Sequence, residues 1–249
     1  MKEILLPDRI FGKNTDEALE RVLKGDAQQA PAQNQTQANA PDLNGFIYVP
    51  SINLYFAEER TNYNLNWKDT HKEIIPKGYN MPTPMETWEL IECLKGNLGD
   101  SRFRKVYEDI LKPQDAWHGE WQNAIFSKEN KVMYVQKVTG IGIKGEPILS
   151  AKEKLEACLM QDGYADIKNK LNLNQQGLCK VASGLQDYTQ GDNIYFWHPR
   201  ENVVARFVAN SVRANLNCIM NPSYSDSSLG VRLVVRPKGA SSKRGLNKQ

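Results

Sequence analysis

The segment from Asn202 to Arg232 constrains the fold of this chain more than any other. It is rich in Asn and Ser, and side chains of unrelated character interrupt it without keeping a helical or a strand period for long. A core strand or an amphipathic helix would keep one of those periods. The pattern therefore predicts a scaffold that holds positions filled without reference to folding. These positions are Val203, Val204, Val208, Val212, Ile219, Met220, Tyr224 and Asp226.

Length and composition limit the class of protein. A chain of 249 residues with 40% hydrophobic side chains is long enough for one large domain with an appendage. The mean hydropathy is −0.59, no apolar run approaches the roughly 20 residues of a membrane span, and the N-terminal segment does not have the form of an export signal. The net charge of +3 is nearly balanced and lacks a basic stripe, so no nucleic acid partner is predicted.

Composition shifts along the chain predict four regions. Residues 1–25 form a short N-terminal appendage with a helix that begins at Asn14 or Thr15. Residues 26–43 are a Gln/Ala/Asn/Pro stretch that reads as a flexible linker. A globular domain spans residues 44–238, and residues 239–249 are a basic tail expected to be disordered.

The globular region predicts an α+β fold, with helices in its first half and strands dominating its second. Residues 45–60 form strands broken at Pro50, and residues 62–82 are irregular. Capping boxes begin helices at Thr83 and at Ser150, the second running to about residue 160. Further elements are a helix over 101–111, a hairpin over 121–138, a short helix within 162–177, and strands over 193–199 and 230–237.

Chemical motifs are sparse. The three histidines are scattered, and no catalytic, nucleotide-binding or metal-binding signature is present, so no catalytic residue, metal ligand or cofactor is predicted. The four cysteines form no C-x-x-C pair, which favours free thiols. The guanidinium groups of Arg206, Arg213 and Arg232 are expected to tie loop carbonyls together as framework residues.

The segment FWHPRENVVARFVANSVRANLNCIMNPSYSDSSLGVRLVVRP, residues 196–237, resembles the variable region of diversity-generating retroelement target proteins, specifically the archaeal AvpA type. The resemblance covers about the last fifth of the chain. It implies a C-type lectin-like fold, with two or more helices packed on antiparallel sheets. It also implies that the terminal strand SLGVRLVVRP pairs near the first strand of the domain, within residues 45–57.

In this family a reverse transcriptase misincorporates at template adenines, so an Asn codon of the AAY type becomes many residue types but never a stop. Met220 departs from this pattern, because AAY cannot reach Met, and Asn193 is either an unmutated variable site or framework. Trp197 is expected to belong to the inward-facing framework. The variable, ligand-binding positions that the resemblance implies, within about residues 192–232, are Ile194, Tyr195, Val203, Val204, Val208, Val212, Ile219, Met220, Tyr224 and Asp226.

A position that tolerates Val, Tyr or Asp must be exposed, because burying an unpaired Asp costs several kcal/mol. The leading hypothesis is a non-enzymatic, monomeric receptor for a macromolecule, expected to be a protein, with Tyr195 and Tyr224 as anchors. Two alternatives remain open: a formylglycine-generating type of enzyme, which needs Cys179 and Cys218 close together, and a calcium-dependent sugar lectin. Localisation is open; display on a cell or virion surface would suit a receptor.

Overall fold

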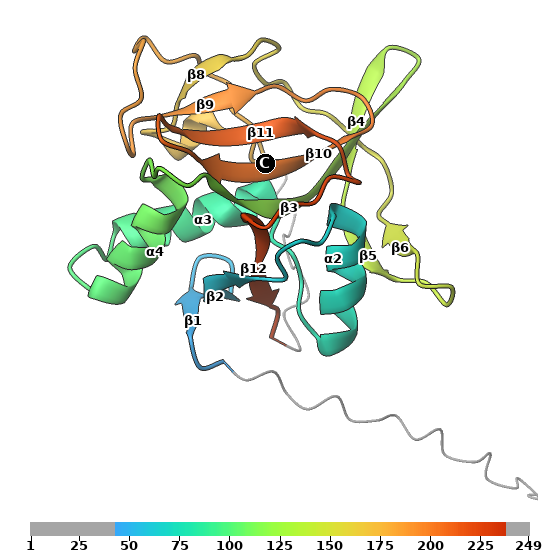
Figure 1. Cartoon of the computed structure of the whole chain (residues 1–249). Coiled ribbons are helices and arrows are strands. Elements are labelled where there is room, and N and C mark those ends of the chain that lie inside the picture. The colour runs from blue at the N-terminus through green and yellow to red at the C-terminus, as the bar shows by residue number, and fades with distance from the viewer. Residues whose placement is uncertain (1–42, 238–249) are drawn as a thin grey trace, which may run out of the picture. The chain divides into compact units, whose positions relative to one another are not determined.

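The structure is a computed structural model, and it describes residues 43–237 (Figure 1). The predicted N-terminal appendage with its helix, the linker except Leu43, and the basic tail lie outside the described residues. The described part of the chain is α+β, with three α-helices and one large sheet.

The large sheet has ten strands. Strands β4 (Val132–Gln136) and β7 (Glu153–Lys154) extend it beside β3, and β5 (Val138–Ile141) pairs with β6 (Pro147–Leu149) separately. The main path runs β1 (Phe46–Val49), β2 (Leu54–Thr61), β12 (Leu229–Val235), β3 (His118–Glu129), β10 (Val203–Ala209), β11 (Ala214–Met220), β9 (Asn193–Trp197), β8 (Gly163–Asp166).

The sheet is mixed, so the prediction of antiparallel sheets is only partly correct. Strand β11 lies between β10 and β9, antiparallel to the first and parallel to the second. Strand β12 is parallel to β3 and antiparallel to β2. The pairing of β12 with β2 confirms the expectation that the terminal strand joins the sheet near the first strand of the domain.

Helices α3 (Pro84–Lys95) and α4 (Ser101–Leu111) cover one face of this sheet and enclose the main core (Figure 1). The capping box predicted at Thr83 is present: its side chain accepts from the Glu86 amide, and Glu86 accepts from the Thr83 amide. The Trp88 ring meets Phe207 of β10 edge to face, with 5.1 Å between centroids.

Helix α2 (Trp67–Ile74) and the 3₁₀ turn η1 (Ile75–Lys77) lie in the segment predicted to be irregular, so that prediction is wrong. Asn66 caps the helix by accepting from the Asp69 amide. Trp67, His71 and Ile74 have the i, i+4, i+7 spacing of one helical face and are buried. They pack in a second core with Trp121 and strand residues on the opposite side of the sheet.

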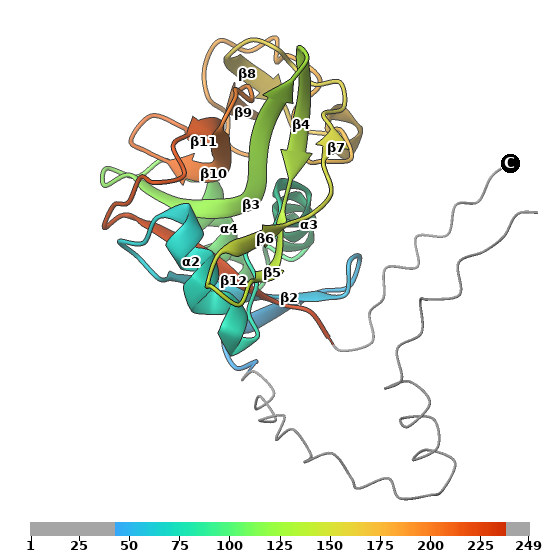
Figure 2. The same ribbon diagram turned by 90° about the vertical axis from the view of Figure 1, so that its right-hand side faces the viewer.

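The helix predicted from Ser150 does not form. The Ser150 hydroxyl instead contacts the Lys137 amide and the Ala151 carbonyl, and Glu153 and Lys154 pair with β4 as strand β7 (Figure 2). Leu155 and Leu159 reach the main core from an extended backbone. Further on, the predicted short helix is reduced to the 3₁₀ turn η2 (Lys170–Asn172), because Gly163–Asp166 is the edge strand β8.

Candidate functional site

The predicted variable region builds one face of the sheet, which we call the outer face: the side of β9, β11 and β10 turned away from α3. Successive side chains of a strand point to opposite sides, so one set from each strand faces α3 and the other faces outward. The inward set is buried in the main core and consists of Ile194, Phe196, Ala205, Phe207, Ala209, Ala214, Leu216 and Cys218. The outward set, aligned by strand register, includes Tyr195, Trp197, Arg206, Val208, Asn215 and Asn217.

Seven of the predicted variable positions have side chains with exposed surface. Val212, in the turn between β10 and β11, is 65% exposed, and Tyr224, in the loop after β11, is 36% exposed. The other five are half-buried: Tyr195, Val203, Ile219, Met220 and Asp226.

Three predicted variable positions are buried, so the expectation that they are exposed is wrong. Ile194 is fully buried because it shares the inward side of β9 with Phe196. Val204 is fully buried because α2 covers its end of β10, where Val204 packs in the second core. Val208 points outward, but its side chain packs closely over Gly119 on the neighbouring strand β3.

An aromatic group lies at the β8–β9 edge of the outer face. The ring centroid of Tyr195 is 5.2 Å from that of Tyr164 and 5.1 Å from that of Trp197. The guanidinium carbon of Arg213 lies 3.6 Å from the Tyr195 centroid, within cation–π distance. Trp197 is therefore a half-buried member of this aromatic group, and the prediction that it belongs to the inward-facing framework is wrong. The ring of Tyr195, one of the two expected anchors, is in contact with the Arg213 guanidinium group.

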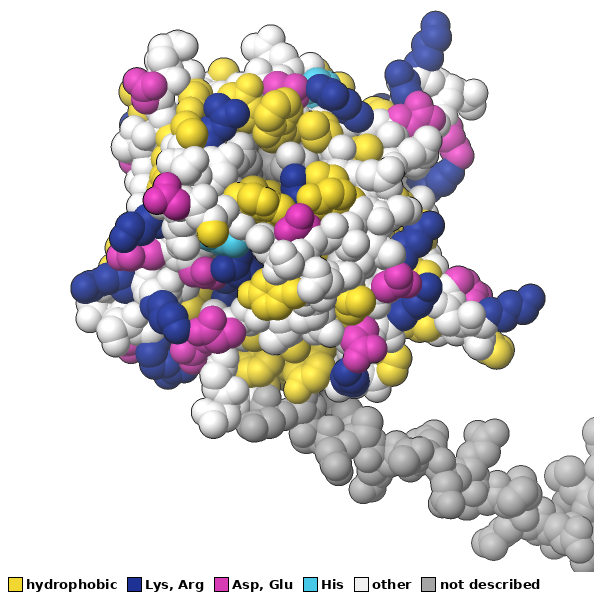
Figure 3. Space-filling model, viewed as in Figure 1, with side chains coloured by type: hydrophobic (Ala, Val, Ile, Leu, Met, Phe, Trp, Pro, Cys, Tyr) yellow, Lys and Arg dark blue, Asp and Glu magenta, His cyan; other side chains and the backbone are white. Residues whose placement is uncertain are grey.

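Arg206 lies at the β3 side of the same face, between two aromatic rings. Its guanidinium carbon is 5.4 Å from the Trp117 centroid and 5.7 Å from the Tyr224 centroid. Burial lowers the pKa of Arg206 to about 10, while Tyr224 and Asp226 act in the opposite direction. Figure 3 shows basic side chains among hydrophobic ones around a hollow over β10 and β11.

The three arginines predicted as framework ties differ sharply. Arg232 is fully buried, pairs with Asp109 and Glu120, and donates to the carbonyls of Ala57 and Glu58. These are the contacts of a framework residue. Arg206 and Arg213 tie no carbonyl within residues 43–237; their contacts are with aromatic rings. Their side chains are long enough to cross the sheet surface and stack instead of turning back to the backbone.

Short polar side chains hold the loops around this face. Asn210 accepts from the amides of Val212 and Arg213, and Asn221 accepts from that of Ser223. Asp226 accepts from the Ser228 amide and from the Tyr224 hydroxyl. These side chains fix the backbone of both loops in an Asx-type geometry, so their neighbours can point outward.

Main-chain bonds also anchor the loop after β11 to the rest of the domain. The amides of Asn64 and Trp67 donate to the carbonyls of Asp226 and Pro222, and the Gly119 amide donates to that of Ser228. These bonds use no side chain of the loop. Asn193, by contrast, is a framework residue, because its side chain is fully buried. Its Oδ1 atom accepts from the Thr189 amide, and its Nδ2 atom donates to the Asp187 carbonyl.

Sequence reasoning missed four residues of this face: Trp117, Tyr164, Asn215 and Asn217. Trp117 and Tyr164 lie outside the predicted variable region, about residues 192–232, and no local pattern connects them to it. The two asparagines were grouped with the general polar framework. Strand alternation with Leu216 and Cys218 was the signal that places them on the outward side of β11.

The enzyme alternative requires Cys179 near Cys218, and the two thiols do act on each other, but neither is activated. Cys179 and Cys218 are buried free thiols, and burial raises the pKa of each, with the neighbouring thiols acting in the same direction. An activated nucleophilic cysteine has a lowered pKa instead. Within the described residues, no group of three or more His, Cys, Asp or Glu side chains has the arrangement of a metal site.

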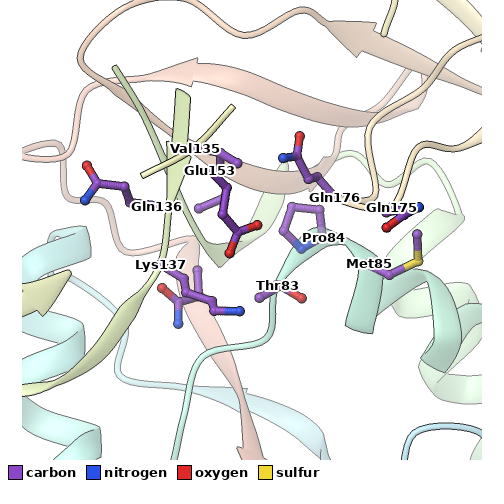
Figure 4. A pocket seen from close by; sticks show the side chains of 11 residues that line it. Thr83, Pro84, Met85, Val135, Gln136, Lys137, Glu153, Gln175 and Gln176 are labelled. Atoms are coloured by element: carbon purple, nitrogen blue, oxygen red, sulfur yellow. The ribbon is translucent and has the colours of Figure 1, made fainter. Parts of the chain in front are cut away.

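A pocket of about 110 Å³ lies elsewhere, between the start of α3, strands β4 and β7, and residues 175–176 (Figure 4). Glu153, Lys137 and Gln176 point toward it (Figure 4). None of the predicted variable residues lines it. The outer face, and not this pocket, is therefore where the residues of the variable region come together.

No family model, no curated protein and no solved structure matches this chain. Among residues 43–237, no helix has both the length and the apolar character needed to cross a bilayer.

Proposed function

We propose that this protein is a non-enzymatic receptor with a C-type lectin-like fold, and that its outer face displays side chains written by retroelement mutagenesis. One observation carries the proposal. Within one contiguous segment, the uncorrelated side chains Val212, Ile219, Tyr224 and Asp226 keep exposed surface, while alternate residues are buried in the main core. Strand alternation separates Ile219 from the core, and Val212, Tyr224 and Asp226 lie in the loops at the ends of β11.

The energetics support that separation. Substitution at an exposed site away from special contacts changes stability by about 0.5 kcal/mol or less, whereas a charge buried in a core costs several kcal/mol. The loop after β11 keeps its main-chain anchors whichever side chain replaces Tyr224. The face also has fixed aromatic residues, Trp117, Tyr164 and Trp197, that add contact area around the variable ones.

The fold assignment rests on the arrangement of the ends of the domain. The terminal strand β12 returns to pair with β2, three helices follow the first strands, and long irregular connections precede β9. Of these features, the helices and the return of β12 beside the first strands are the ones that the sequence resemblance implies, and they support the proposed fold.

Two matched libraries displayed on yeast test the function. One randomises Val212, Ile219, Tyr224 and Asp226, and the control randomises Ala205, Phe207, Leu216 and Cys218. We expect most members of the first library and few of the second to resist proteolysis, and binders to unrelated proteins to emerge from the first. Equal losses of folded protein in both libraries would contradict the proposal.

A genomic test is independent of folding. We expect a reverse transcriptase gene near the locus, and a near-identical template repeat with adenines at the codons for Tyr195, Val212, Ile219, Tyr224 and Asp226. Sibling loci that carry the same residues at these positions would count against diversification.

A further inference from the structure

Arginine contacts distinguish the outer face from the rest of the domain. Residues 43–237 contain eight arginines, and six of them donate to a carboxylate or a carbonyl: Arg60, Arg102, Arg104, Arg200, Arg232 and Arg236. The remaining two, Arg206 and Arg213, are both on the outer face, and neither forms an ion pair or side-chain hydrogen bond within the described residues.

Among the described residues, the Arg206 and Arg213 side chains lack hydrogen-bond partners although parts of both guanidinium groups are removed from water. The Nε and Nη1 atoms of Arg206 and the Nε atom of Arg213 are buried and have no acceptor within the described part of the chain. A buried donor without an acceptor costs roughly 1–3 kcal/mol, and more when the group is charged. The fold supplies acceptors for Arg232, so the lack of acceptors around Arg206 and Arg213 is local to this face.

Both guanidinium groups are held in place by aromatic rings. Arg206 lies between Trp117 and Tyr224, and Arg213 lies on Tyr195. An aromatic ring attracts a guanidinium group without accepting hydrogen bonds from its edge, so the N–H groups keep their capacity to donate to a ligand. A planar anion that accepts two parallel hydrogen bonds is the complement of such an edge.

We propose that the outer face recognises an acidic segment of a partner protein, and that Arg206 and Arg213 each receive an Asp or Glu carboxylate from it. This inference rests on the proposed receptor function and specifies the chemistry of the ligand. The ring of Tyr224 stands on the exposed loop, and its displacement opens the buried N–H groups of Arg206 to the ligand.

The surroundings favour a carboxylate over a polyanion. Asp226 lies close enough to Arg206 to act on its charge, and both Asp226 oxygens are already hydrogen-bonded, to Tyr224 and Ser228. In this sequence the negative charge of Asp226 repels a doubly charged phosphate more than a singly charged carboxylate. The rings of Trp117, Tyr195 and Trp197 offer apolar contact to the residues that flank the acidic one.

Selection from a displayed random dodecapeptide library on the full chain tests the proposal. We expect the selected peptides to be enriched in Asp and Glu. Their affinity should fall at least tenfold for the double variant R206Q/R213Q and for peptides with Gln in place of Glu. The matched control R236Q, which removes a surface arginine paired with Glu86 elsewhere, should bind as the wild type does.

Several results would overturn the proposal. The first is a library that yields no peptide, or only peptides without acidic residues. The second is a set of peptides that bind the double variant as well as the wild type. The third is displacement of the selected peptides by phosphopeptides or inorganic phosphate at a lower concentration than by acetate. Non-acidic peptides whose binding is abolished by Y224A and V212D would leave the receptor function standing. Peptides insensitive to every substitution on the outer face would contradict both.

Thermal unfolding supplies a readout that does not depend on a ligand. R206Q and R213Q remove charges that the fold does not pair, so their Tm values should equal or exceed that of the wild type, whereas R232Q should lower Tm. A loss of Tm in R206Q as large as in R232Q would make Arg206 a structural tie and overturn the proposal.

Discussion

His71 makes the stability of this protein depend on pH, in a way that a single substitution should remove. His71 lies on helix α2, and its side chain is fully buried. The Trp67 ring meets the imidazole edge to face, with 4.5 Å between the ring centroids. Both ring nitrogens are buried without a hydrogen-bond partner in the described residues. Burial lowers the pKa of His71 from 6.5 to about 3.

The sign and size of the effect follow from proton binding. Below pH 6.5 the unfolded chain binds a proton at His71, and the folded chain does not bind it until about pH 3. The free energy of unfolding is therefore complete above pH 6.5 and decreases as the pH falls toward 3. Each pH unit in this window contributes about 1.4 kcal/mol, so His71 should remove about 2 kcal/mol of stability by pH 5.

Urea unfolding of the wild type and of H71L between pH 5.0 and 7.5 measures this contribution. Leucine has a similar volume and does not titrate, and the contributions of His118 and His198 cancel between the two proteins. We expect the loss of unfolding free energy from pH 7.5 to 5.0 to be about 2 kcal/mol smaller in H71L. Parallel pH profiles, or a His71 imidazole that titrates near pH 6 in the folded protein, would refute the reasoning.

Three further predictions concern the framework. Replacing Arg232 by Met leaves the buried Glu120 unpaired and should cost about 3–5 kcal/mol, measured by urea unfolding, and adding E120Q should recover part of the loss. Thr83→Ala removes the N-cap of α3 and should cost about 1 kcal/mol, whereas an unchanged Tm would contradict the capping role. In native protein at pH 8, Cys179 and Cys218 should react with a thiol reagent only as the chain unfolds, because burial raises their pKa values; immediate labelling of both would argue against this core.

Local signals explain which elements could be predicted from sequence. Thr83 with Glu86 begins α3 because both halves of the capping box and an apolar helical face are encoded within one turn. Ser150 with Glu153 has the same motif but begins no helix, because β4 offers Glu153 a strand partner 18 residues earlier, at Val135. The sequence does contain the Asn66 cap and the apolar spacing of α2. The many polar residues around them nevertheless favoured the prediction of an irregular segment.

At the candidate site, the alternation of side chains along strands predicts which residues face outward. The residue types reachable from an AAY codon do not predict this by themselves. Phe196 is an aromatic residue of the main core, and strand alternation places Ile194 on the same inward side of β9. The burial of Val204, in contrast, depends on α2, which reaches its end of β10 from more than 120 residues earlier in the chain and leaves no mark near Val204. The stacking of Arg206 on Trp117 is a long-range contact of the same kind.

If the proposed function holds, the unpaired arginines explain why a diversified surface is separated from the framework that supports it. A fixed anchor such as Arg206 must stay solvated or stacked, because a carboxylate supplied by the fold would occupy the donors that a ligand needs. The outer face meets this requirement with aromatic rings, which hold the guanidinium plane without consuming its N–H groups. Asp226, one of the proposed variable positions, raises the pKa of Arg206 through its negative charge. In the proposed function, variation at that position would therefore tune how strongly Arg206 attracts an anion, and it would also remove the hydrogen bonds that Asp226 accepts from Tyr224 and Ser228.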